Sequence, residues 1–230
     1  MKWQRENALA VIDTSSSPKD EYVILLHGLA RTHRSMTTLA LALNAAGYHT
    51  INFSYPSTQY HIAKLAEDAI TAALAQCPKG SKVHFVTHSM GGILVRQYLH
   101  LHTIENLGRV VMLGPPNKGS EVVDRLKTLP GFKFINGPAG MQLGTRLVDQ
   151  PRMLGAANFD VGIIAGTRSF NLLLSSLLPT PNDGKVSVAS TLLDDMSDHI
   201  AIAVTHTFMM KNKIVIAQVL HFLMHGKFNH

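Results

Sequence analysis

The chain has 230 residues, which is enough to bury one sizeable core, and α/β proteins of this length commonly fold as a single domain. Its 46% hydrophobic and 16% charged residues exclude an intrinsically disordered protein. The formal net charge of +6 comes from scattered lysines and arginines without a recognisable nucleic-acid-binding motif. We therefore expect residues 1–230 to form one domain that has no nucleic-acid partner.

The N-terminus and the cysteine content favour a cytoplasmic protein. Residues 1–7 carry charges on both sides of Trp3 and lack the apolar stretch of a signal peptide, although a processed precursor stays an alternative. Residues 35–63 carry no charge, but Asn44, Gly47 and Pro56 interrupt them, which is not typical of a membrane span. Cys77 is the only cysteine, so no intrachain disulfide can form. Peripheral contact with a membrane surface stays open, and so does the oligomeric state.

Short apolar runs alternate with helical patterns along the chain. In chain order, we expect strands at residues 8–12 and 22–26, a helix at 36–46, a strand at 48–53, a helix at 61–76, a strand at 83–86, a helix at 91–98, strands at 109–113, 161–165 and 199–204, and a helix at 211–223. This alternation predicts an α/β fold with a mostly parallel central sheet and helices on both faces. In such sheets the ligand site lies at the carboxyl ends of the strands.

The strand at residues 22–26 ends abruptly in His27-Gly28-Leu29. A glycine at this position lets the backbone turn so that the next N–H points into the site. An amide aimed at an oxyanion can stabilise a transition state by about 3 kcal/mol. We expect the Leu29 N–H to serve in this way, with His27 stabilising the loop; a plain strand-to-helix turn is the alternative.

Residues 83–92, V-H-F-V-T-H-S-M-G-G, place Ser89 on a sharp bend between a strand and a helix. This is the pattern of a nucleophile elbow, in which the serine hydroxyl is exposed above the sheet. Gly91 supplies the small residue needed where the two backbones approach, and the Met90 N–H is the expected second oxyanion donor. His88 is expected to pack beside the elbow. The alternative is an ordinary turn with a helix-capping serine.

Two later segments have competing interpretations. Residues 114–160 are rich in proline and glycine, which predicts an irregular excursion that forms either a small cap over the site or a surface loop. Leucines cluster at residues 172–178, where they either line an acyl pocket or belong to the core.

A serine nucleophile needs a histidine to take its proton and a carboxylate to orient that histidine. Ser89, Asp183 and His206 occur in the chain order serine, acid, histidine that α/β-hydrolases use. Asp183 lies in a Pro-Asn-Asp-Gly turn after the strand at 161–165, and His206 follows the last strand. Asp198 is nearer to His206 and stays the main competitor, with Asp194 and Asp195 beside it.

The motifs V-T-H-S-M-G-G, L-L-H-G-L, G-P-P-N-K-G-S, P-N-D-G-K-V-S-V and T-H-T-F-M-M together resemble the bacterial lipase/esterase branch of the α/β-hydrolases. The resemblance covers roughly residues 21–225 and extends to small triacylglycerol lipases and inositol-deacylase-like serine esterases. It implies Ser89 as nucleophile, Asp183 and His206 as its partners, and Leu29 and Met90 as amide donors. Thr87 departs from the glycine or alanine that lipases usually have two residues before the serine.

These observations predict a carboxylic-ester hydrolase that works through an acyl-enzyme on a small-molecule or lipid ester. No grouping of His, Cys and acidic residues has metal-ligand spacing, so we expect no metal and no organic cofactor. Acyl transfer and thioester hydrolysis use the same three residues and stay alternatives. A non-catalytic binding module with this fold is a further one.

Overall fold

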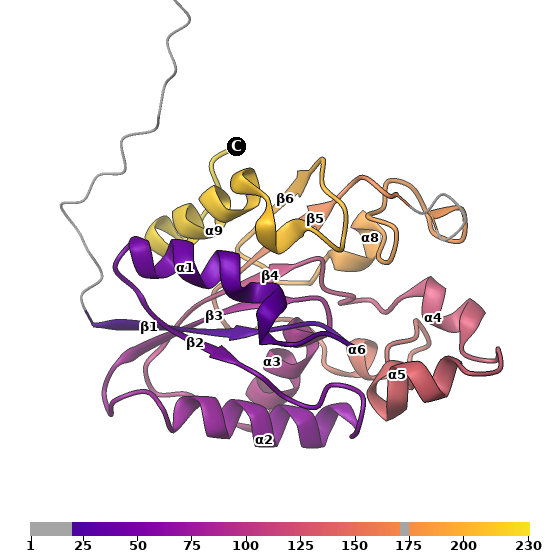
Figure 1. The fold of residues 1–230 in the computed structure, drawn as a ribbon, viewed down its shortest axis with the longest axis horizontal. Coiled ribbons are helices and arrows are strands. Elements are labelled where there is room, and N and C mark those ends of the chain that lie inside the picture. Colours follow the sequence, from indigo (N-terminus) through magenta and orange to yellow (C-terminus); the bar gives the residue numbers. More distant parts are fainter. Residues whose placement is uncertain (1–19, 171–174) are drawn as a thin grey trace, which may run out of the picture.

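A six-stranded parallel sheet forms the centre of the molecule (Figure 1). The computed structural model describes residues 20–170 and 175–230, so the strand expected at residues 8–12 lies outside the described residues. The strands are β1 (Glu21–Leu26), β2 (His49–Phe53), β3 (Lys82–His88), β4 (Leu107–Leu113), β5 (Val161–Gly166) and β6 (Asp198–Ile202). They lie in the order β2-β1-β3-β4-β5-β6, which confirms the predicted parallel α/β fold.

Helices cover both faces of this sheet (Figure 1). Helices α2 (Ile62–Leu74) and α3 (Met90–Leu101) pack on one face, and α1 (Thr37–Ala45) and α9 (Lys213–His225) pack on the other. Each side has its own apolar core. In α2 the buried residues recur every three to four positions, namely Ile62, Leu65, Ala66, Ala69, Ile70 and Ala73. Burying each large aliphatic side chain contributes about 1.5–3 kcal/mol, so packing on the sheet determines where these helices form.

Shorter helices connect these elements. Two 3-10 helices, η2 (His33–Met36) and η3 (Met209–Lys211), precede α1 and α9, and α8 (Val188–Thr191) lies between β5 and β6. The last helix therefore begins at Lys213, slightly later than the pattern predicts. Of the leucine cluster, residues 172–174 lie outside the described part of the chain, while Leu178 is buried and Leu177 is partly exposed.

Residues 114–160 contain more regular structure than their composition predicts. They form α4 (Glu121–Leu126), α5 (Phe132–Met141) and α6 (Gln150–Met153). Gly137, with φ 64° and ψ −170°, breaks α5 just before Pro138, so these two residues kink a helix instead of preventing one. Figure 1 shows α4 and α5 beyond the carboxyl ends of the strands, on the right of the view. We call residues 114–160 the cap segment.

Candidate active site

Ser89 lies between β3 and α3 in a backbone conformation that L residues rarely adopt. Its φ is 54° and its ψ is −121°, and positive φ values are costly for residues with a Cβ atom. A Cβ atom at Gly91 would lie 2.6 Å from the carbonyl oxygen of Leu26, so only glycine fits where α3 leaves the sheet. Thr87 is fully buried in β3 ahead of this bend, and the turn accommodates it. The side chain of Ser89 is consequently part-exposed at the carboxyl edge of the sheet.

Asp183 and His206 form a buried pair. Asp183 Oδ2 lies 2.7 Å from His206 Nδ1, and both residues are only 3% exposed. The other carboxylate oxygen, Oδ1, accepts the backbone N–H groups of Lys185 at 2.9 Å and Val186 at 2.8 Å. The His206 N–H also donates to the Asp183 carbonyl over 3.1 Å. The loop of Asp183 and the loop of His206 are therefore joined by both backbone and side-chain bonds. On the other side of the ring, His206 Nε2 has no hydrogen-bond partner among the described residues.

The end of β4 brings this pair next to the serine. The Ser89 N–H donates to the carbonyl of Leu113 over 2.8 Å. The next residue, Gly114, has a φ of 54°, and a Cβ atom there would lie 3.0 Å from Asp183 Oδ2 and 3.1 Å from His206 Nδ1, so a side chain would be strained and crowded. Ser89, Asp183 and His206 thus gather around one strand end, where a parallel sheet commonly binds its ligand.

The loop after β1 also lies against the serine. A Cβ atom at Gly28 would lie 3.1 Å from Ser89 Cβ. The next N–H, that of Leu29, makes no backbone hydrogen bond within the described part of the chain. Met90 begins α3, so its N–H has no acceptor inside the helix. Within the described residues, neither of these two N–H groups has a hydrogen-bond acceptor, so both can donate beside Ser89.

His27 fixes the loop that carries Leu29. Its Nδ1–H donates to the Gly28 carbonyl over 2.9 Å, and its Nε2 accepts the Tyr55 N–H over 3.3 Å. The Tyr55 ring stacks on the imidazole with centroids 4.1 Å apart, and its hydroxyl donates to the His27 carbonyl. Burial lowers the pKa of His27, so the imidazole stays neutral and keeps both bonds.

Similarity to known proteins assigns the family. Residues 23–208 match the alpha/beta hydrolase family. The chain belongs to that family. The match confirms the family that the motifs predict, and with it the α/β-hydrolase fold.

A lipase, a phospholipase and a carboxyl esterase of known structure share the fold at low sequence identity. The mature lipase BlEst2 of Bacillus licheniformis is 20% identical with a TM-score of 0.71, over 90% of this chain and 93% of the lipase. The phospholipase PlaB of Legionella pneumophila is 17% identical with a TM-score of 0.68, over 90% of this chain and 60% of PlaB. The metagenomic carboxyl esterase MGS0156 is 17% identical with a TM-score of 0.61, over 83% of this chain and 65% of the esterase. A comparison with curated protein sequences found no match.

His88 is the third buried histidine of this hydrolase's site, after His206 and His27. Its Nε2–H donates to the His206 carbonyl over 2.9 Å, and the two rings lie 4.7 Å apart. Burial, and next the neighbouring His206, hold the pKa of His88 well below its usual range. His88 therefore packs beside the elbow, as the sequence predicts, and it also bonds to the loop of His206.

The competing carboxylates lie elsewhere. Asp198 begins β6 and His206 follows the end of that strand, so the two residues lie at opposite ends of β6. The Asp198 oxygens accept the N–H groups of His199 at 2.7 Å and Phe228 at 2.7 Å. Asp194 and Asp195 are exposed in the turn before β6. Of the candidate acids, the structure places Asp183 against His206.

Tyr55 and Ser57 are site residues that the sequence motifs did not reveal. Ser57 Oγ accepts the N–H of Ala30 over 3.1 Å, so the segment after β2 fixes the loop after β1 at two points. The sequence signal for both residues is the S-Y-P-S segment at residues 54–57, which directly follows a predicted strand. The carboxyl end of that strand lies at the same edge of the parallel sheet as Ser89.

Neither a cluster of metal-ligand side chains nor a membrane-spanning helix is present in the part of the chain that is described. Over residues 20–170 and 175–230, no group of three or more His, Cys, Asp or Glu side chains could hold a metal ion. Within the same residues, every helix is too short or too polar to cross a bilayer.

Proposed function

We propose that this alpha/beta hydrolase cleaves carboxylic esters through an acyl-enzyme, with Ser89 as nucleophile, His206 as general base and Asp183 as its orienting acid. The observation that supports this most directly is the 2.7 Å contact between Asp183 Oδ2 and His206 Nδ1, beside a serine with a strained backbone. A carboxylate on Nδ1 fixes the imidazole tautomer that leaves Nε2 unprotonated and able to accept a proton.

The reaction begins when Ser89 Oγ attacks the ester carbonyl carbon and its proton passes to His206 Nε2. The carbonyl oxygen becomes an oxyanion, which the Leu29 and Met90 N–H groups stabilise by about 3 kcal/mol for each well-placed donor. The tetrahedral intermediate collapses, the C–O bond to the alcohol breaks, and His206 returns the proton to the leaving oxygen. Water then attacks the acyl-enzyme by the same route and releases the acid.

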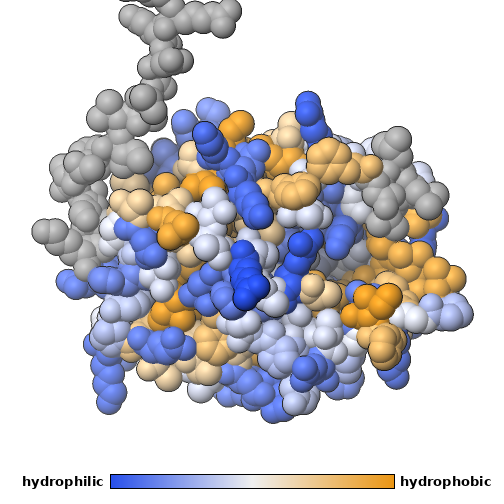
Figure 2. All heavy atoms as spheres, viewed as in Figure 1, coloured by the Kyte–Doolittle hydropathy of each residue, from blue (hydrophilic) through white to orange (hydrophobic). Residues whose placement is uncertain are grey.

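The expected substrate is a small-molecule or lipid ester with an apolar acyl part. Large apolar side chains are exposed on the cap segment, including Phe134 at 94%, Leu147 at 75% and Val148 at 72%. Figure 2 shows hydrophobic residues gathered on the right of the view, over the region of α4 and α5. Such a patch supports peripheral contact with a lipid surface that presents the ester to the site.

The proposal is tested by following p-nitrophenyl butyrate hydrolysis by the wild type and the Ser89→Ala variant. We expect the variant to lose activity by a factor of roughly 10³ or more. A fluorophosphonate should add one adduct to the wild type and none to Ser89→Ala, as read by intact mass. Equal hydrolysis by the two proteins would overturn the assignment, and butyl ester formation in added butanol would point to acyl transfer instead.

A further inference from the structure

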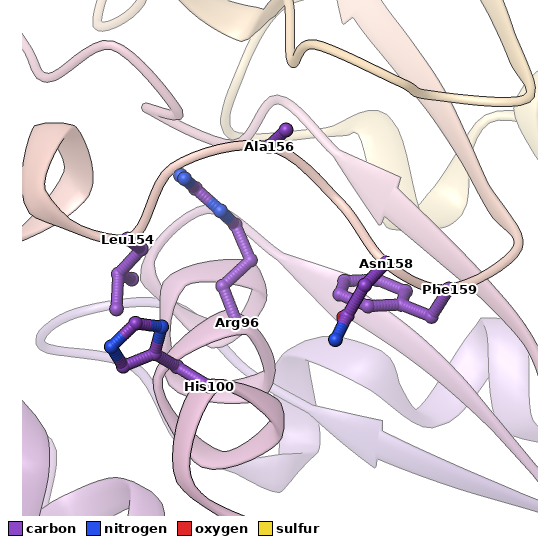
Figure 3. A pocket seen from close by; sticks show the side chains of 6 residues that line it. All are labelled: Arg96, His100, Leu154, Ala156, Asn158 and Phe159. Atoms are coloured by element: carbon purple, nitrogen blue, oxygen red, sulfur yellow. The ribbon is translucent and has the colours of Figure 1, made fainter.

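A polar cavity lies along α3, away from the serine. It has a volume of about 140 Å³ and is lined by Arg96, His100, Leu154, Ala156, Asn158 and Phe159 (Figure 3). Arg96 follows Ser89 by seven positions on the helix, which corresponds to about 10 Å along the axis. The cavity is therefore formed by the second half of α3 and the loop before β5, and it is separate from the proposed catalytic residues.

Arg96 is a buried cation held by neutral groups. The residue is 4% exposed; its Nη1 donates to the Asn117 carbonyl at 3.1 Å and to Asn117 Oδ1 at 3.3 Å, and its Nη2 donates to the Gly155 carbonyl at 2.7 Å. A guanidinium has five N–H donors. Among the described residues, no partner accepts its Nε–H or its remaining Nη2 hydrogen, so donors are left at the wall of the cavity.

The charge on Arg96 lacks a bonded counter-ion. Burial lowers the pKa of the guanidinium to about 10, and the nearby Asp194 acts in the opposite direction. Asp194 is exposed, and no ion pair joins it to Arg96 within the described ranges. A buried charge without an opposite charge at hydrogen-bond distance is costly, and a bound anion would remove that cost.

The remaining walls divide into a polar and an apolar part. His100 and Asn158 are exposed side chains that can donate hydrogen bonds, while Leu154, Ala156 and Phe159 supply hydrocarbon. In Figure 3, Arg96 reaches up from α3 toward the loop at Ala156, with Leu154 to one side and Phe159 to the other. An apolar cavity of about 150 Å³ admits benzene, a molecule of six carbon atoms, so a ligand of about that size fits here.

We propose that this cavity binds a short-chain carboxylate, with the carboxylate on the Arg96 Nε–H and Nη2–H edge and the hydrocarbon against Leu154 and Phe159. A planar carboxylate matches that edge of a guanidinium with two parallel hydrogen bonds. The apolar wall favours an acid with an alkyl chain over an inorganic anion. The proposal is independent of the proposed function, since it uses none of the residues at the serine.

Calorimetric titration with sodium butyrate tests the proposal, with butyramide and inorganic phosphate as comparison ligands. Butyramide has the same shape without the charge, so we expect it to bind roughly tenfold more weakly or not at all. Phosphate lacks the hydrocarbon and is also expected to bind more weakly. Equal binding of either comparison ligand would overturn the assignment to a short-chain carboxylate.

Two variants locate the binding without removing Arg96, whose guanidinium links Asn117 to Gly155. Ala156→Phe fills the cavity from an exposed position, and we expect it to abolish butyrate binding, whereas Ala72→Phe on the exposed face of α2 should leave it unchanged. Asp194→Asn removes a repelling charge and should tighten binding, most clearly at low salt. Unchanged affinity in both Ala156→Phe and Asp194→Asn would overturn the site.

The same titration on protein treated with a fluorophosphonate separates this cavity from product binding at Ser89. Retained butyrate affinity in the modified protein supports the α3 cavity, and loss of affinity places the butyrate at the serine and overturns the proposal. If the protein does not react with the reagent, the proposed function fails, while the Ala156→Phe comparison still decides the cavity.

Discussion

The imidazole of His88 donates its Nε2–H to the main-chain carbonyl of His206, over 2.9 Å. The residue just before the proposed nucleophile thus holds the loop of the proposed base, 118 positions away in the sequence. The bond connects the end of β3 to the segment after β6 across the sheet edge. Its donor role requires a proton on Nε2, and the other nitrogen, Nδ1, is buried without a partner among the described residues.

His88→Leu is expected to destabilise the protein and slow the reaction. The variant keeps most of the side-chain volume but leaves the His206 carbonyl without its donor, which should cost about 1–3 kcal/mol of unfolding free energy in urea titrations. We also expect a lower kcat with a similar KM for p-nitrophenyl butyrate, because the base moves while the acyl site stays. His33→Leu, at an exposed position, is the control and should change neither quantity. Wild-type stability and kcat in His88→Leu would contradict the role of this bond.

Asp183→Asn should reduce kcat by a factor of roughly 10³–10⁴, because the amide favours the wrong imidazole tautomer. Asp198→Asn is the matched variant, since Asp198 begins β6, at the opposite end of that strand from His206, and accepts the Phe228 N–H. It should retain near-normal kcat in the same assay. If Asp198→Asn lost more activity than Asp183→Asn, the acid would be wrongly assigned.

Stability should fall as the pH drops below about 6.5, the ordinary histidine pKa in an unfolded chain. Burial lowers the folded-state pKa values of His27, His84, His88 and His199. The unfolded chain then binds more protons, so the stabilisation is complete above the unfolded-state pKa and is lost as the pH falls through it toward the folded values. For each histidine, a tenfold difference in proton affinity between the folded and unfolded states corresponds to about 1.4 kcal/mol of stability.

Urea unfolding at pH 7.5 and pH 5.5 measures this effect. His84 has a clear reason to resist protonation, because its Nδ1 accepts the Arg109 N–H over 2.8 Å while its Nε2 donates to Glu21 over 2.9 Å. His84→Gln should therefore lessen the pH dependence even though it lowers stability at pH 7.5. Equal wild-type stability at the two pH values would show that these imidazoles titrate normally.

Phe134→Ser should weaken binding to vesicles that contain phosphatidylglycerol. Four cations lie in residues 125–148, but Lys127 pairs with Asp124 and Arg146 pairs with Asp149. Arg125 and Lys133 have no ion-pair partner among the described residues, so they are the cations that can attract an anionic lipid near the exposed Phe134. Burying one such side chain in lipid is worth about 1.5–3 kcal/mol, which corresponds to at least a tenfold change in vesicle affinity. Leu41→Ser, which removes an exposed apolar side chain of α1, should have little effect. Equal losses in both variants would argue against a specific role for the cap segment.

The sequence by itself determined the order of the strands along the chain and the bend at Ser89. It also determined that Asp183 and His206 follow later strands. These features are local: apolar runs and helical spacing set the elements, and Gly91 fits because two backbones meet there. The parallel sheet follows from the alternation, and it brings every strand's carboxyl end to one edge. For that reason the sequence predicts that His27, Ser89, Asp183 and His206 lie at one site.

The sequence favoured Asp183 as the acid, because it follows the strand at 161–165, but left Asp198 as a competitor nearer to His206. The tertiary structure decided between them, because it brings Asp183 into contact with His206 and places Asp198 at the start of β6. It also decided that the cap segment is partly helical, since Gly137 and Pro138 mark a kink that composition alone does not distinguish from a loop. The bond from His88 to His206 and the carbonyls around Arg96 join residues distant in sequence. Such contacts depend on how elements pack in space, and no local pattern encodes them.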